Sequence, residues 1–269
     1  MLNPHFGTPQ GILFFVLFFA FAYYGMAVPQ QLILRRVDVL RNPEFWQKSA
    51  LFISILGTAI AFYHHYALDV STNPPERYFL RKVLANSKNF AVIVVPLVIV
   101  KFFFDRNDAS GFYGLTFKRF NATPFVLLLL ILLPLIAWAS FQPEFLRAYP
   151  TLKPWRLQPA FGLSTNVLFG IYEVVYGIDF ITIELLFRGA LVIGMRRLLG
   201  REAVLPMVCV YAFLHFGKPL GETLGSVAGG YVLGVIALYS RNIFGGCIVH
   251  IGLAYLMELA ALLQHALRG

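Results

Sequence analysis

Long apolar runs alternate with short polar and basic connectors along the whole chain. A helix needs about 20 mostly apolar residues to cross the roughly 30 Å hydrocarbon core of a membrane, and several runs approach that length. Because backbone groups must be hydrogen-bonded internally in lipid, such runs are expected to form helices. The pattern therefore predicts an all-α fold, a polytopic transmembrane helix bundle of about eight spans. The runs cover residues 11–28, 49–67, 89–104, 122–140, 164–194, 203–216, 224–240 and 243–264.

Two connectors in the first half of the chain differ in character. The stretch QQLILRRVDVLRNPEFWQK (30–48) mixes apolar and basic residues at helical spacing, so we expect it to lie along the membrane interface. The stretch STNPPERYFLRKVLANSKN (71–89) is expected to be a second polar connector, opened by a Pro-Pro pair that resists helix formation. Residues 1–160 are thus predicted to form N-terminal membrane helices with interfacial connectors, followed by a core at 161–269.

Composition and charge agree with a membrane location. The 269 residues are 58% hydrophobic and 13% charged, whereas soluble domains are about a quarter charged. The net charge of +9 comes from short basic clusters between apolar runs, which favours membrane lipids with anionic headgroups as partners and argues against nucleic acid. The first ten residues contain no Lys or Arg, so the first apolar run is expected to be a retained span.

Four ionisable residues interrupt the apolar runs of the C-terminal half: Glu184, Arg188, His215 and His250. Charged groups inside a bilayer are costly and usually mark a working site. Glu184 and Arg188 are four residues apart and can pair, either to build a site or only to stabilise the helix. The two histidines lie on other predicted helices, which favours convergence on one polar cavity. There Glu184 is expected to act as a base or metal ligand, and the histidines to bind metal or polarise a carbonyl group.

Two further carboxylates are candidates for supporting roles near this cavity. Glu173 precedes Glu184 by eleven residues and shares its helix face, about 16 Å away along the axis. Glu258 follows His250 by two helical turns and is expected to orient a ligand or to cap the cavity.

Three short motifs carry these residues in order: Ile183–Arg188 followed by Gly189, Tyr211–His215, and His250–Ala254. Over about 165–260 they resemble the CAAX-protease and bacteriocin-processing family, which includes the type II prenyl-protein proteases. The resemblance implies a bundle of membrane helices and an intramembrane endopeptidase. It also implies Glu184, Arg188, His215 and His250 as catalytic residues, with a divalent metal, zinc, held by Glu184, His215 and His250.

The chain departs from the family pattern at two motif positions. Ile183 stands where the family has its first glutamate, and Ala254 stands where it often has an asparagine. With these departures, the resemblance implies a divergent intramembrane metalloprotease that cleaves a membrane-associated or lipid-modified polypeptide, as a multi-pass protein of the bacterial inner membrane. A catalytically silent scaffold that binds a membrane-protein partner stays open as an alternative, and so does a small-solute transporter.

Overall fold

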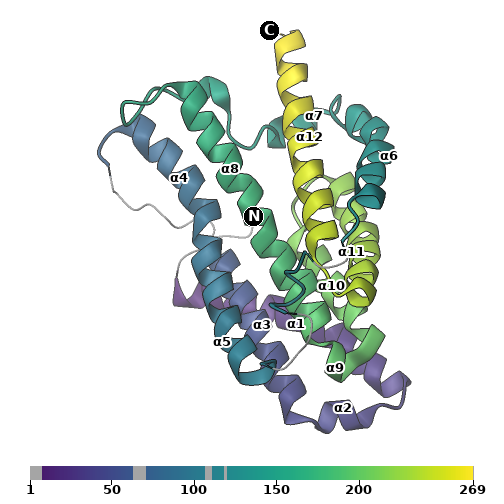
Figure 1. Cartoon of the computed structure of the whole chain (residues 1–269). Helices are drawn as coiled ribbons and strands as arrows, with labels where there is room; N and C mark the ends of the chain where they lie inside the picture. The colour runs from purple at the N-terminus through teal and green to yellow at the C-terminus, as the bar shows by residue number, and fades with distance from the viewer. Residues whose placement is uncertain (1–7, 63–70, 107–110, 118–119, 269) are drawn as a thin grey trace. The chain divides into compact units, whose positions relative to one another are not determined.

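The computed structural model describes residues 8–62, 71–106, 111–117 and 120–268, and most of these residues lie in helices (Figure 1). These residues contain no strand, and their only β-type pairings are two isolated bridges, Phe112 with Leu115 and Ala160 with Leu163. The predicted all-α class is confirmed. The elements are α1 (Pro9–Ile33), α2 (Val37–Arg41), α3 (Pro43–Ala61), α4 (Pro74–Asn89), η1 (Phe90–Val94), α5 (Val95–Phe104), α6 (Thr123–Ala139), α7 (Pro143–Ala148), η2 (Pro154–Arg156), α8 (Thr165–Glu184), η3 (Leu185–Gly194), α9 (Arg196–Leu199), η4 (Gly200–Ala203), α10 (Val204–Leu214), α11 (Leu220–Ser240) and α12 (Phe244–Arg268).

Four stretches of helix in the described residues are long and apolar enough to cross a membrane. They are Pro9–Ile33, Pro74–Phe104, Leu220–Ser240 and Phe244–Leu267, and the shorter apolar helix α6 accompanies them. This fits the predicted integral membrane protein. Each of the other predicted runs also contains a helix, but the total of about eight spans stays a prediction.

The prediction that the Pro-Pro pair in the connector 71–89 resists helix formation is wrong. Helix α4 begins at Pro74 and continues through the π-helix η1 into α5, so one helical stretch runs to Phe104. Pro74 and Pro75 occupy the first turn, where the backbone N–H that proline lacks has no intrahelical partner in any case. The proline pair therefore starts the helix, and only the residues before it form the connector.

The chain divides into two compact units that interleave along the sequence. Unit 1 comprises Met1–His65, Lys88–Phe120 and Thr182–Gly246. Unit 2 comprises Tyr66–Ser87, Asn121–Ile181 and Cys247–Gly269. These units are defined by packing. The predicted division into residues 1–160 and 161–269 is a functional one, and it stays a prediction.

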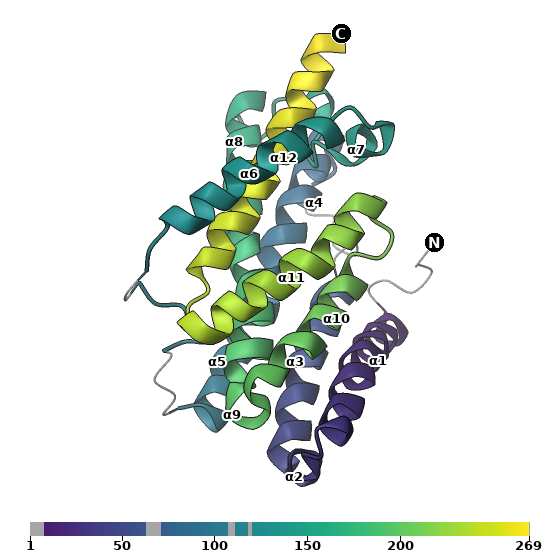
Figure 2. The same ribbon diagram turned by 90° about the vertical axis from the view of Figure 1, so that its right-hand side faces the viewer.

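Unit 1 is built on helices that pack closely. Helix α1 lies against α3 and α10, and α10 lies against both α11 and η3 (Figure 2). A Cβ atom added at Gly234 of α11 would lie 2.6 Å from Met207 Cε of α10, and one added at Gly230 would lie 3.1 Å from the ring of Tyr211. Small residues let these two helices approach, as is common between membrane helices.

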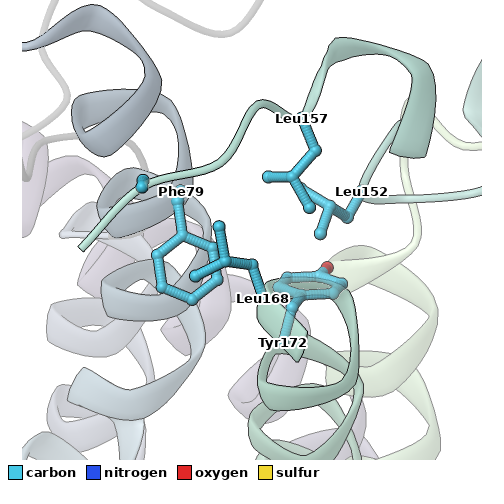
Figure 3. Close-up of a cluster of buried hydrophobic side chains, with 6 residues drawn as sticks. Phe79, Leu152, Leu157, Leu168 and Tyr172 are labelled. Carbon is cyan, nitrogen blue, oxygen red and sulfur yellow. The ribbon is translucent and has the colours of Figure 1, made fainter. Parts of the chain in front are cut away.

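Unit 2 has its own apolar core. Phe79 of α4 and Tyr172 of α8 pack with Leu168 and with the segment that precedes α8, through Leu152 and Leu157 (Figure 3). All five side chains are buried. This core joins the irregular segment between α7 and α8 to two helices of the same unit.

Candidate active site

Glu184 is the last residue of α8, and the chain passes directly from it into the π-helix η3, which carries Arg188. The regular helix expected through 164–194 therefore changes its hydrogen-bonding pattern at the predicted site. Long π-helical segments are rare, and short ones occur frequently at functional sites. Arg188 Nη1 donates to Glu184 Oε1 at 2.7 Å, and both side chains are buried, so the expected pair is present.

Tyr211 of α10 connects Arg188 to His215. The Arg188 guanidinium carbon lies 4.5 Å from the centre of the Tyr211 ring, a cation–π contact, and the ring of His215 lies 4.5 Å from that of Tyr211. His215 Nδ1 lies 2.8 Å from the carbonyl oxygen of Tyr211. Since a carbonyl oxygen can only accept, Nδ1 carries the proton in the neutral ring and Nε2 is the nitrogen that can accept a proton or bind a metal.

The start of α12 approaches the carboxylate of Glu184 closely. A Cβ atom added at Gly246 would lie 2.9 Å from Glu184 Cδ and closer still to Oε2. Only glycine leaves room for the carboxylate in its present position. Sequence reasoning missed Gly246, although the Gly245-Gly246 pair just before the His250 motif is a signal of close backbone approach.

Arg188 keeps hydrogen-bonding capacity beyond the ion pair. Its Nε and Nη2 groups are buried, and neither has a hydrogen-bond partner among the described residues. A buried guanidinium with donors to spare is suited to bind a carbonyl oxygen or an oxyanion. Glu184, Arg188 and His215 thus form one buried polar cluster in unit 1.

The other predicted site residues lie in unit 2. The ring of His250 on α12 packs against Phe180 of α8, with ring centres 4.4 Å apart. The backbone carbonyl oxygen of Glu173 accepts a hydrogen bond from the Tyr255 hydroxyl at 2.7 Å. The convergence of His250 with the unit 1 cluster and the supporting role of Glu173 stay predictions.

Glu258 holds the segment that precedes α8. Its carboxylate accepts from the backbone N–H of Thr151 at 2.8 Å and from the Thr151 hydroxyl, while Lys82 donates to the Thr151 carbonyl oxygen at 2.8 Å. Burial lowers the pKa of nearby Lys153, and the Glu258 carboxylate opposes that shift. The contacts of Glu258 are structural, and the expected role beside the cavity stays a prediction.

The fit to a zinc ion is incomplete. Glu184 and His215 supply two donors in unit 1, whereas a catalytic zinc site normally uses three protein ligands. No group of three or more His, Cys, Asp or Glu side chains comes together as a metal site in the described part of the chain. No reaction step is therefore derived through a metal.

Residues 165–256 match the family described as type II CAAX prenyl endopeptidase Rce1-like. The match contains all three motifs and confirms the resemblance. No curated protein and no solved structure matches the chain. At the level of the family, the Rce1-like match supports a protease-type enzyme.

The two predicted departures from the family pattern are Ile183 and Ala254. Ala254 is buried in α12 and Ile183 is partly buried beside Glu184. Neither side chain can accept a proton or donate a hydrogen bond. In the described unit 1 cluster, Glu184 and His215 carry the side chains that can accept a proton.

Proposed function

We propose that this chain is an intramembrane endopeptidase of the CAAX type, which cleaves a membrane-associated or lipid-modified polypeptide near its C-terminus. The observation that carries the proposal is the buried Glu184–Arg188 pair, which Tyr211 connects to His215, inside the segment that matches the Rce1-like family. An ion pair buried in an apolar bundle is costly, and function is the usual reason for one in a membrane protein. The proposed location is the inner membrane of a bacterial cell.

In the proposed reaction, Glu184 acts as a general base. Arg188 orients the carboxylate through Oε1, and the carboxylate accepts a proton from the attacking water as the water oxygen bonds to the scissile carbonyl carbon. The resulting oxyanion is stabilised by the buried Nε–H and Nη2–H groups of Arg188 and by His215 in its protonated form. Collapse of the intermediate breaks the C–N bond, and Glu184 returns the proton to the leaving amine.

His250 is proposed as a further catalytic residue that stabilises the oxyanion. A divalent ion such as zinc, held by Glu184, His215 and His250, is a separate proposal on which these steps do not depend. Membrane lipids and the polypeptide substrate are the proposed partners.

The test is cleavage by the purified protein in proteoliposomes. A farnesylated peptide with a C-terminal tripeptide extension is the substrate, and release of the tripeptide is followed by mass spectrometry. Glu184→Gln and His215→Ala are each expected to lower the rate at least about a hundredfold, because each removes a group that acts on the reacting atoms. Glu144→Gln is the matched control, since Glu144 lies on α7, is exposed and pairs with the exposed Arg147.

Circular dichroism and size-exclusion chromatography establish that each variant is folded. Cleavage by Glu184→Gln at the wild-type rate would refute the assignment of the base. A folded wild-type protein that cleaves no prenylated peptide would instead support the catalytically silent scaffold.

A further inference from the structure

A second buried ion pair lies at the far end of the π-helix. Lys48 of α3 is completely buried, and its Nζ donates to Asp105 Oδ1 at 2.5 Å and to the backbone carbonyl oxygen of Gly194 at 2.6 Å. Gly194 is the last residue of η3, the helix that carries Arg188. Lys48 thus contacts the end of the element whose beginning forms the candidate site.

The contact supplies a hydrogen-bond donor to the backbone at the end of η3. The last carbonyl groups of a helix have no intrahelical donor, and a buried carbonyl group without a donor is costly. Lys48 supplies that donor to Gly194. A buried ammonium group alone would also be costly, and Asp105, itself buried, neutralises it.

Tyr113 holds the same helix along its side. A Cβ atom at Gly189 would lie 2.8 Å from the Tyr113 carbonyl oxygen, and one at Gly194 would lie 2.9 Å from Tyr113 Cε1. Tyr113 is completely buried, so it has little freedom to move away. The π-helix is therefore enclosed on one side by Tyr113 and bound at its end by Lys48, which restricts any shift of Arg188 along the helix.

We propose that Lys48, neutralised by Asp105, is a positioning residue for the reaction. By binding the Gly194 carbonyl group it keeps η3 in its π-helical hydrogen-bonding pattern, and this places Arg188 against Glu184. The inference deepens the proposed function and depends on it only for the effect on cleavage. The effect on the π-helix is independent of any activity.

The positioning role of Lys48 is tested by the double variant Lys48→Met, Asp105→Leu. Both charges are removed together, so neither is left buried without its partner, while the Gly194 carbonyl group loses its donor. Lys88→Met is the matched control, because Lys88 Nζ donates to the Ala59 carbonyl oxygen at 2.9 Å, at the end of α3. The control therefore loses the same kind of contact at another helix end.

Hydrogen exchange measured by mass spectrometry in nanodiscs is the first readout. In the double variant, exchange of peptides within 185–195 is expected to rise about tenfold, as for the loss of one hydrogen bond to a charged group. Peptides from α11 are expected to exchange as in the wild type, and Lys88→Met is expected to leave η3 unchanged. Unchanged exchange of η3 in the double variant, or an equal rise in the control, would overturn the proposal.

The kinetic readout separates positioning from general destabilisation. The double variant is expected to have a kcat at least about tenfold lower at unchanged KM, because Arg188 acts on the reacting atoms. Faster exchange of η3 with an unchanged kcat would refute the positioning role while leaving the proposed function in place. If the wild type cleaves nothing, the proposed function fails, and the exchange data alone decide whether Lys48 holds the helix.

Discussion

Adding one methyl group at Gly246 is expected to displace the proposed catalytic base. The new Cβ would lie 2.9 Å from Glu184 Cδ and closer to Oε2, whereas carbon atoms in contact are normally about 3.5–4.0 Å apart. The carboxylate must therefore move by about 1 Å. We expect this shift to lengthen its 2.7 Å hydrogen bond to Arg188. A misplacement of about 1 Å at a reacting group can cost about a hundredfold in rate, so we expect Gly246→Ala to lower kcat by ten- to a hundredfold.

Gly225→Ala is the matched control for this substitution. Gly225 lies in α11, and a Cβ atom there would meet no heavy atom within 4 Å. Both substitutions raise helix propensity by up to about 1 kcal/mol, but only the one at Gly246 also overpacks the site, at a cost of about 1–3 kcal/mol. The difference in thermal stability between the two variants, measured in the same detergent, gives the cost of the contact between the new Cβ and Glu184.

A double-mutant cycle with Glu184→Ala provides a test that needs no activity. Gly246→Ala should destabilise the wild type but not the Glu184→Ala protein, giving a coupling energy of about 1–3 kcal/mol. If Gly246→Ala is as stable as Gly225→Ala and cleaves at the wild-type rate, the carboxylate is not held in place by Arg188, and the reasoning fails.

Two further predictions concern Glu258 and the proposed metal. Glu258→Ala is expected to lower stability by about 1–3 kcal/mol, because Thr151 loses its acceptor, while cleavage per folded molecule stays unchanged; loss of cleavage by a fully folded variant would assign Glu258 to the reaction. If Glu184, His215 and His250 hold zinc, elemental analysis should find about one ion per chain in the wild type and none in His215→Ala. An equal zinc content in both proteins would contradict that ligand set.

The motifs were predictable because they depend on residue type and order alone. Glu184, Arg188 and His215 were identified as ionisable groups in apolar runs, and the structure brings these three together around Tyr211. The pairing of Glu184 with Arg188 follows from a four-residue spacing. Tyr211 was noted only as a motif position, and its contact with the guanidinium depends on how α10 packs on η3.

Other features could not be predicted from local patterns. The change from α-helix to π-helix at Leu185 has no signature in the apolar run, because the pattern of hydrophobic residues barely differs between the two. The helix begun by Pro74 was missed because a proline pair can end one helix or start the next, and only the following contacts decide. The importance of Gly246 depends on a neighbour 62 positions away in the chain (246 minus 184).

The sequence by itself determined the helical class, the membrane character and the residues that carry the Rce1-like motifs, since lipid requires helices and tolerates few ionisable groups. The tertiary structure decided which of these groups are in contact with one another. The Glu184 carboxylate lies between Arg188 and the backbone at Gly246, and Lys48 reaches the end of η3 from another helix. Such contacts join residues far apart in the chain, and only close packing brings them together.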